Sequence, residues 1–254
     1  MTKYLNNTKI DWCDKTWNTV TGCENWRKEC RINGKSYCYA KSFYCRFYEN
    51  FKPTYHPERL EAIFKLKPPT KEQNRKRKSW IAKAFPHTWL VFCSSVSDLF
   101  ADWTQHKWRH TTLLRIEDAE RCGYPVIVQL LTKQPQNIKK YYSDVWDPSL
   151  KNLWIGVTVT SQDDVWKLKY LKDVKCTVRF ASFEPLLSEI HIPPEYVSYL
   201  DWVIIGRLTG SNKVKLQFEW VQEIIDSAKQ YRIPVFIKNN VEWPIEMREF
   251  PKLD

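Results

Sequence analysis

Short runs of continuous apolar residues recur along the chain, and each is followed by a polar or amphipathic stretch. Runs of Val, Ile and Leu without alternation are typical of strands buried on both faces, as in a parallel sheet. A first strand is expected at either Lys9–Trp12 or Trp17–Val20. The later strands are predicted at Thr88–Cys93, Pro125–Leu131, Leu153–Val159, Thr177–Ala181, Trp202–Gly206 and Pro234–Ile237.

The segments between these strands have the pattern of helices, which we expect at Pro57–Leu66, about Thr111–Cys122, Ser161–Leu171 and Phe218–Tyr231. About seven consecutive βα units predict an α/β fold with mostly parallel strands, as a full or partial TIM-like barrel. Alternation does not show whether a sheet closes, so an open doubly wound sheet is the alternative. The length and the absence of a low-complexity linker predict a single domain over residues 1–254.

Polar residues follow the predicted strands from the second to the last. In a barrel or an open parallel sheet these positions surround a shared mouth, so the pattern predicts one active site there. Two of them have structural alternatives, because Asp98 could cap a helix and Glu184 could pair with Arg179. The candidate residues are Ser94, Ser95, Ser97, Asp98, Thr132, Lys133, Thr158, Thr160, Ser182, Glu184, Arg207, Lys238 and Asn239.

Three cysteines, Cys23, Cys30 and Cys38, lie in a polar loop at about residues 21–40, directly after a predicted first strand. Three thiolates without a fourth nearby leave one metal free to react, so the pattern predicts an iron–sulfur cluster with one open iron. Zinc is an alternative, although the segment has neither a paired C-x2-C element nor a nearby histidine. Unligated buried thiols are another alternative. Cys13 or Cys45 could supply an additional ligand.

The other three cysteines, Cys93, Cys122 and Cys176, fall in strand or helix patterns and are interpreted as small core residues. The uneven cysteine spacing and the lack of a signal-peptide pattern argue against a secreted disulfide scaffold and favour a reducing cytoplasm. No apolar run approaches the roughly 20 residues of a membrane span, so we expect no membrane association.

The chain has 40 Lys and Arg residues against 29 Asp and Glu, a formal net charge of +11. This charge would attract polyanions and favours a nucleic acid or nucleotide as the partner. Much of it lies in the run from Lys65 to Lys83, which has eight basic residues and overlaps a basic insertion near residues 67–87. The run is expected to be a solvated surface helix or mobile loop, and alternatively an arm that neutralises phosphates.

Over nearly its whole length the sequence resembles the phage-associated, radical-SAM-like three-cysteine proteins, a phage protein family of unknown function. Short motifs carry the resemblance, in order along the chain. They are Ile10-Asp11-Trp12, Thr16-Trp17-Asn18, Val20-Thr21-Gly22-Cys23, Cys38-Tyr39-Ala40, His56-Pro57-Glu58-Arg59-Leu60, Ser97-Asp98-Leu99-Phe100, Gln129-Leu130-Leu131-Thr132-Lys133, Leu153-Trp154-Ile155-Gly156-Val157, Phe183-Glu184-Pro185-Leu186-Leu187, Asp201-Trp202-Val203-Ile204 and Phe236-Ile237-Lys238.

The resemblance implies a TIM-like barrel with a [4Fe-4S] cluster on Cys23, Cys30 and Cys38, whose open iron binds S-adenosylmethionine. Reductive cleavage of that cofactor would give a 5′-deoxyadenosyl radical. An external electron donor is therefore implied, and a partner protein could deliver the electron. On this basis Ser95, Asp98, Thr158 and Arg207 are expected to bind the cofactor, with Arg207 also facing the substrate. The expected catalytic residues on the substrate side are Lys133, Glu184 and Lys238.

The sequence departs from the family pattern at three places. Seven residues separate Cys30 from Cys38, whereas the family keeps a short gap, and the basic run near Lys71–Lys83 is an insertion. After the sixth strand the chain has Gly206-Arg207-Leu208-Thr209-Gly210 where the family has Gly-Gly-Glu followed by Ser-Gly. Gaining a cation and losing an acid favours an anionic, phosphate-bearing substrate.

Three functions follow from these observations. The leading hypothesis is a radical S-adenosylmethionine enzyme that modifies a nucleic acid base or a nucleotide. The first alternative is a nucleic-acid-binding protein with a structural zinc site and no radical chemistry. The second is a hydrolase or lyase that uses Lys133 and Glu184 as an acid–base pair, with Lys133 able to form a Schiff base.

Overall fold

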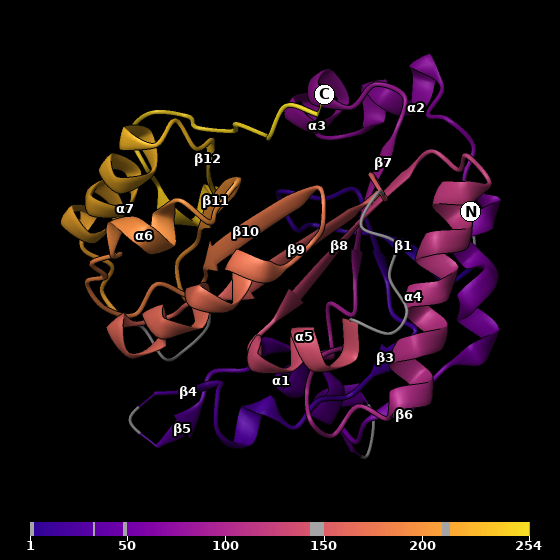
Figure 1. Cartoon of the computed structure of the whole chain (residues 1–254), viewed down its shortest axis with the longest axis horizontal. Coiled ribbons are helices and arrows are strands. Elements are labelled where there is room, and N and C mark those ends of the chain that lie inside the picture. Colours follow the sequence, from indigo (N-terminus) through magenta and orange to yellow (C-terminus); the bar gives the residue numbers. More distant parts are fainter. Residues whose placement is uncertain (1–2, 33, 48–49, 143–149, 210–213, 254) are drawn as a thin grey trace.

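The computed structural model describes residues 3–32, 34–47, 50–142, 150–209 and 214–253. Its centre is an eight-stranded sheet with the order β1-β2-β7-β8-β9-β10-β11-β12, seen in Figure 1. Only the β1–β2 pair among these is antiparallel. The strands are β1 (Leu5–Asn7), β2 (Lys15–Trp17), β7 (Trp89–Cys93), β8 (Val126–Thr132), β9 (Leu153–Thr158), β10 (Val178–Phe183), β11 (Trp202–Ile205) and β12 (Val235–Ile237).

The strands of this sheet follow one another in chain order without a reversal. A doubly wound sheet reverses its strand order, so that alternative is wrong. The fully closed barrel is not formed either, because no pairing among the described residues joins β12 to β1. The free edge of β12 is taken by the chain near the C-terminus: Ile237 donates from its amide to the Met247 carbonyl at 2.9 Å, and Glu249 to that of Val235 at 3.2 Å. The fold is therefore mixed α/β with an open, mostly parallel sheet.

The two faces of the sheet bury different kinds of side chain, because successive residues of a strand point to opposite faces. Aliphatic residues such as Val91, Val128 and Ile155 form the larger cluster with residues of the surrounding helices. The other face carries a smaller cluster rich in aromatic rings, which includes Trp12, Phe92, Trp154, Phe180, Trp202 and Phe236. These rings fill the inner side of the sheet.

The helices lie mainly along the outer side of the sheet, where Figure 1 shows α4, α5 and α7. The α-helices are α1 (Tyr39–Phe47), α2 (Lys71–Lys76), α3 (Ser79–Ala84), α4 (His106–Arg121), α5 (Gln136–Tyr142), α6 (Pro194–Val197) and α7 (Phe218–Gln230). The 3-10 helices are η1 (Asn25–Arg27), η2 (Pro57–Lys65), η3 (Gln162–Asp173) and η4 (Asn239–Val241). Two small antiparallel pairs complete the fold, β3 (Val20–Thr21) with β6 (Thr54–Tyr55) and β4 (Arg31–Ile32) with β5 (Lys35–Ser36). None of the described helices has the length and apolar character needed to cross a membrane.

The six later strands lie within one or two residues of the predicted ranges, and two other predictions are corrected. The first of the parallel strands, β2, begins before the second proposed segment and overlaps it only at Trp17. Helix α4 begins at His106, five residues before the predicted start. Its first turn is held by the buried guanidinium of Arg109, which donates to the carbonyls of Leu99, Ala101 and Thr104. These contacts come from the loop before the helix, so the spacing of apolar residues in the sequence does not show where the helix begins.

Of the three cysteines interpreted as core residues, Cys93 is buried, Cys176 is half-buried and Cys122 is exposed. The interpretation is wrong for Cys122, because this residue follows the last turn of α4 and is its C-cap.

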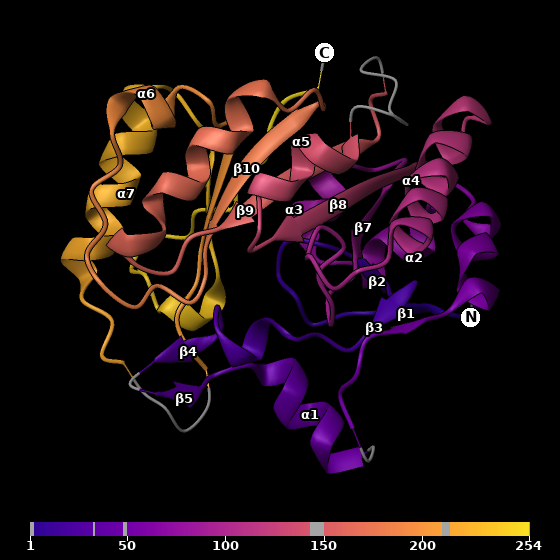
Figure 2. The same ribbon diagram turned by 60° about the horizontal axis from the view of Figure 1, so that its bottom comes forward.

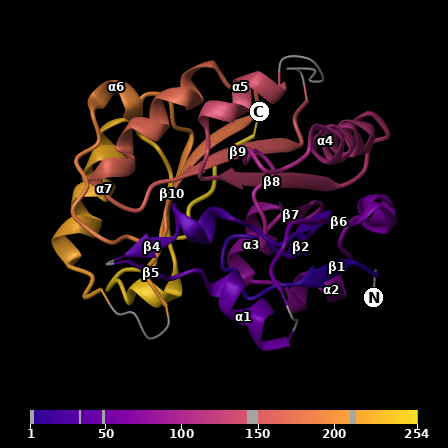
Figure 3. The same cartoon turned by 90° about the horizontal axis from the view of Figure 1, so that it is seen from below.

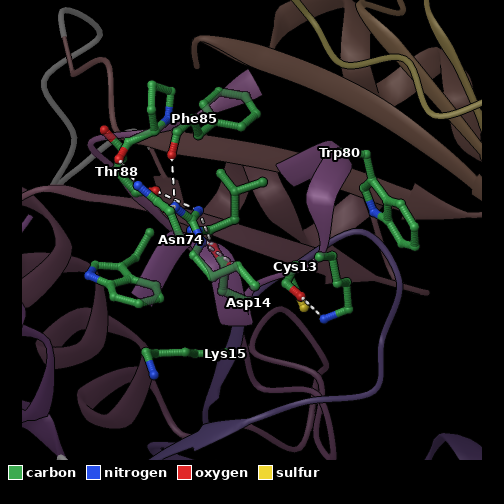
Figure 4. Close-up of polar contacts among 12 residues, drawn as sticks. Cys13, Asp14, Lys15, Asn74, Trp80, Phe85 and Thr88 are labelled. Carbon is green, nitrogen blue, oxygen red and sulfur yellow. Dashed lines mark hydrogen bonds and ion pairs between the residues drawn. The ribbon is translucent and has the colours of Figure 1, made fainter. Parts of the chain in front are cut away.

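The basic run is ordered as the two short helices α2 and α3. Figure 4 shows the contacts that hold them. Arg77 forms a bidentate ion pair with Asp14, at 2.9 and 2.7 Å, and also donates to the carbonyls of Phe85 and Thr88. Lys78 donates to the Cys13 carbonyl at 2.8 Å. Because Asp14 and Thr88 directly precede β2 and β7, the two helices are docked at the amino ends of the strands.

In the basic run the expected surface helix is formed, as α2 and α3, and the expected mobile loop is not. Two of its cations are used as internal anchors: the side chain of Arg77 is 4% exposed and that of its partner Asp14 is 3% exposed. An ion pair this deeply buried loses its hydration, and removing one partner leaves an uncompensated charge. The pair is therefore a strong constraint on the placement of α2 and α3.

Replacing Arg77 by Met tests this constraint. We expect Arg77→Met to lower the free energy of unfolding by about 3–5 kcal/mol, because Asp14 would remain buried without its cation. The matched control is Lys76→Met, at the residue next to Arg77. It removes an exposed ion-pair partner of Glu72 and should change the free energy of unfolding by no more than about 0.5 kcal/mol. Urea denaturation followed by circular dichroism measures both, and equal effects would contradict the anchoring role.

Candidate functional site

A cavity of about 510 Å³ opens where the strands of the main sheet end. Figure 2 shows α1 and the β4–β5 hairpin on this side of the sheet. Figure 3, viewed from below, shows the same segment in indigo and purple in front of the strands. Every residue predicted as a metal ligand, cofactor contact or catalytic group lines this cavity: Cys23, Cys30, Cys38, Ser95, Asp98, Lys133, Thr158, Glu184, Arg207 and Lys238.

The cysteine-bearing segment is shaped by a tight approach of two chain segments at Gly22. This glycine has a φ of +79°, and a side chain there would overlap the carbonyl oxygen of Lys52. The next amide, of Cys23, donates to the Phe51 carbonyl at 3.3 Å. Only glycine adopts this conformation without strain, so Gly22 sets the direction in which the Cys23 side chain leaves the chain.

The three thiols differ in burial and hydrogen bonding. Cys23 and Cys30 are buried, and Cys38 is half-buried at the start of α1. The Sγ of Cys23 accepts from the Asn25 amide and that of Cys38 from the Lys41 amide, each at 3.4 Å. Backbone N–H donors of this kind stabilise thiolates, the form in which cysteine binds metal.

Cys30 and Cys38 are close enough to share a hydrogen bond. This bond lowers the pKa of Cys38 to about 6 and raises that of Cys30. Burial is the main cause that raises the pKa of Cys23. Sharing a proton in this way makes one thiol of the pair easier to ionise than a free cysteine.

The donor set is one that both thiolate-bound metal ions and iron–sulfur clusters use. In the part of the chain that the structure describes, no group of three or more His, Cys, Asp and Glu side chains is arranged to hold one metal ion. All three thiols line one cavity.

The two cysteines considered as additional ligands are not among the residues that line the cavity. Cys13 is fully buried in the aromatic cluster inside the sheet, and burial raises the pKa of its thiol. Cys45 is exposed on α1. Residue 33, within the predicted cysteine loop, and Gly210 of the predicted motif after the sixth strand lie outside the described residues.

Asp98 joins the cysteine segment to the sheet. Its Oδ2 accepts from the Asn25 side chain at 2.8 Å and from the Lys133 amide at 3.0 Å. Its Oδ1 accepts from the Thr132 hydroxyl at 2.8 Å and from the Phe100 amide at 3.1 Å. Burial nevertheless raises the pKa of this carboxyl, because these four bonds offset only part of the desolvation.

These four hydrogen bonds use the acceptor positions of the Asp98 carboxylate. We therefore interpret Asp98 as a residue that positions the cysteine segment, instead of a direct cofactor ligand. The alternative of a helix cap also fails, because Asp98 lies eight residues before the first residue of α4. Asn25 is held a second time, since Gln134 donates to its Oδ1 at 2.9 Å.

Lys133 places a cation beside the cysteines. Burial acts to lower the pKa of its ammonium group, but the neighbouring Cys30, Tyr37, Asp164 and Asp98 outweigh burial and raise it. Lys133 is therefore charged, and it faces the part of the cavity where negative charge from thiolates would gather.

On the opposite wall of the cavity Glu184 forms an ion pair with Lys238. The expected alternative partner, Arg179, instead pairs with Asp201 at 3.0 Å. The Glu184–Lys238 pair crosses Gly206, where an added Cβ would lie 2.9 Å from Glu184 and 3.0 Å from Lys238. The glycine after β11 thus makes the room for this pair, a role that Ala could not fill without displacing one side chain.

The remaining predicted residues lie at the rim or the floor. Arg207 is partly exposed and reaches Glu242 at 3.4 Å, which leaves its guanidinium largely free to meet a ligand. Ser95 donates to the Asn18 side chain at 3.2 Å and accepts at its carbonyl from Tyr39 at 2.6 Å. Thr158 lies at the end of β9, next to Ser182 of β10.

Several residues of the site were missed by sequence reasoning. Asn25 follows Cys23 by two positions, and its proximity to the cysteines was the available signal. Lys167 is buried on η3 and pairs with Glu29 of the cysteine segment at 2.9 Å and with Asp164 at 2.7 Å. Such a lysine on a helix has no signal in the sequence, because its partner lies more than a hundred residues away.

The fold and the cavity define an α/β protein with three cysteines at the carboxyl edge of an open, mostly parallel sheet. A family model described as "Protein of unknown function (DUF5131)" matches residues 7–252, so the chain belongs to this family. No curated protein and no solved structure matches the chain.

Replacing Asp98 by Asn tests its positioning role. The amide cannot accept all four hydrogen bonds, so a buried donor loses its partner and stability should fall by about 1–3 kcal/mol. The cysteine segment should loosen, and Cys23 and Cys30 should react faster with an alkylating reagent, as measured by mass spectrometry of each thiol. The control is Asp173→Asn, at an exposed position of η3. Unchanged labelling in Asp98→Asn would contradict this role.

Proposed function

We propose that this protein is a radical enzyme that binds a [4Fe-4S] cluster and S-adenosylmethionine and acts on a nucleic acid base or a nucleotide. The supporting observation is the convergence of Cys23, Cys30 and Cys38 with the polar ends of the strands on one cavity. The sequential order of the parallel strands is also that of a partial barrel, in which such an edge is the usual active site.

The cluster and its cofactor supply reductive cleavage of a sulfonium bond, which allows hydrogen abstraction from an unactivated carbon. The chain's own residues hold the participants and exclude water. Trp12, Phe92 and Leu131 form an apolar part of the cavity lining. The volume of about 510 Å³ lies within the range of small-molecule sites.

The charged residues divide the cavity into two sides. We assign Lys133 to the cysteine side, where its ammonium would pair with the negative charge of the thiolates and of a cofactor carboxylate. The Glu184–Lys238 pair and Arg207 are assigned to the substrate side. Lys238 and Glu184 can hold a proton between them or hydrogen-bond a polar substrate group, and Arg207 supplies a cation at the rim.

A nucleic acid or nucleotide substrate is supported by the formal net charge of +11 and by the cations Lys9 and Arg207 on the cavity lining. The reaction needs an electron from a donor outside the chain, and we propose a cytoplasmic reductant, with a partner protein as its possible carrier. The phage association remains a prediction from the resemblance.

The other two functions have less support. A structural zinc site usually has four protein ligands, whereas the cavity lining contributes three cysteines. A Lys133–Glu184 acid–base pair has less support because Glu184 already pairs with Lys238.

Anaerobic reconstitution with iron and sulfide tests the proposal. We expect four irons per chain with the visible absorbance of a cluster, and 5′-deoxyadenosine after addition of S-adenosylmethionine and a reductant. Cys30→Ala should lose both, because Cys13 and Cys45 lie outside the cavity lining. Cys45→Ala is the matched control and should keep both. Zinc at one per chain, without iron uptake, would overturn the proposal in favour of the zinc alternative.

Lys133→Met tests the assignment of this cation to the cofactor. Loss of a charged hydrogen bond should weaken binding of S-adenosylmethionine to the reconstituted protein by about tenfold or more. Iron content is measured in parallel, so that a failed cluster is distinguished from a weakened cofactor site. Lys9→Met, at the exposed edge of the cavity, is the control and should have a much smaller effect. Equal affinities of Lys133→Met and the unmodified protein would contradict the assignment.

A further inference from the structure

The amino ends of the strands carry a concentrated positive surface. Residues 65–87 contain eight basic and one acidic residue, a formal charge of +7 within a chain of +11. Two of the eight cations, Arg77 and Lys78, are the internal anchors of α2 and α3. The other six are exposed, and we call them the basic face: Lys65, Lys67, Lys71, Arg75, Lys76 and Lys83.

The basic face has a fixed shape. Arg77 binds Asp14 and three groups of the α2–α3 region, and Lys78 binds the carbonyls of Thr8 and Cys13 at 2.9 and 2.8 Å. Helix α2 also begins with a capping box between Thr70 and Gln73. The helices that carry Lys71, Arg75, Lys76 and Lys83 are thus fixed in place before any ligand binds, which lowers the entropy that binding would cost.

A groove of about 970 Å³ continues the basic face between α3 and residues 246–253. Its lining combines aromatic rings with four basic residues, Lys83, His87, Arg248 and Lys252. The Arg248 guanidinium lies over the Trp80 ring, 5.1 Å from its centroid. Its Nε is buried and has no hydrogen-bond partner among the described residues.

We propose that the basic face and this groove bind the phosphate backbone of a nucleic acid, at the end of the molecule opposite the cysteine cavity. Regularly held Lys and Arg side chains neutralise successive phosphates, and a groove with aromatic and cationic walls accepts a sugar or base. A lipid surface suits this face less well, because α2 exposes only charged and amide side chains and has no apolar residue to insert.

This surface gives the protein a way to hold a polyanion independently of the chemistry at the cavity. The cavity lies at the carboxyl ends of the strands and the basic face at their amino ends, so a strand bound here is anchored to the protein without entering the cavity. The proposal does not depend on the cluster or on S-adenosylmethionine.

Binding of a labelled single-stranded oligonucleotide and its duplex, measured by fluorescence anisotropy over a range of salt concentrations, tests the proposal. The triple variant Lys71→Glu/Arg75→Glu/Lys83→Glu should lose at least tenfold in affinity. The slope of log affinity against log salt should fall by about 2 for the single strand, since each lost phosphate contact contributes roughly 0.7. These three side chains are exposed, so circular dichroism and thermal unfolding should stay near those of the unmodified protein.

The matched control is Lys107→Glu/Lys139→Glu/Lys169→Glu, which makes the same change of net charge at exposed sites on α4, α5 and η3. It should lose far less affinity than the basic-face variant. An equal loss in both variants would overturn the proposal, because binding would then follow net charge alone. Binding to phosphatidylserine vesicles without binding to either oligonucleotide would overturn it too. Cys30→Ala should bind as the unmodified protein does, which separates this surface from the proposed enzyme activity.

Discussion

The buried carboxylate of Asp98 is the constraint on which the arrangement of the cavity depends. Four hydrogen bonds bring together the segment after Cys23, the loop after β7 and the end of β8. A carboxylate with no exposure to water is costly unless its acceptors are used, so the three segments are held together or the charge is left unsatisfied. The bond from Asn25 to Asp98 therefore keeps the cysteine segment against the strand ends. A second contact, between Lys167 and Glu29, holds the same segment close to Cys30.

The sheet forms this cavity without closing into a barrel, because large side chains cover its inner face and leave space only at the ends of the strands. Large rings, among them Trp154, Phe180 and Trp202, occupy the inside of the sheet, and Gly156 provides the room for the Phe180 ring, which an added Cβ would overlap. The space above them is lined by smaller and polar side chains at the last positions of the strands. Gly206 then allows two charged groups to meet across one strand end. Closure of the barrel is not needed for either effect.

The two ends of the strands carry different kinds of charge. At the carboxyl ends, charged groups are paired or buried around the cysteines, an environment suited to chemistry away from water. At the amino ends, Asp14 and Arg77 form a buried ion pair that fixes α2 and α3. The neighbouring cations on these helices stay exposed. A protein that acts on a nucleic acid benefits from this separation, since holding the polymer and reacting with one of its groups place opposite demands on hydration.

Local pattern in the sequence was enough to predict the α/β class, the six later strands and the residues at their ends, because apolar runs and the positions after them reflect burial within one element. The same reasoning predicted that Cys23, Cys30 and Cys38 lie at the edge of the sheet. The tertiary structure alone decided that the sheet stays open, that Glu184 meets Lys238 instead of Arg179, and that Arg77 is an anchor rather than a surface charge. These outcomes depend on contacts between residues far apart in the chain, and a side chain's type does not show whether it will be buried against such a partner.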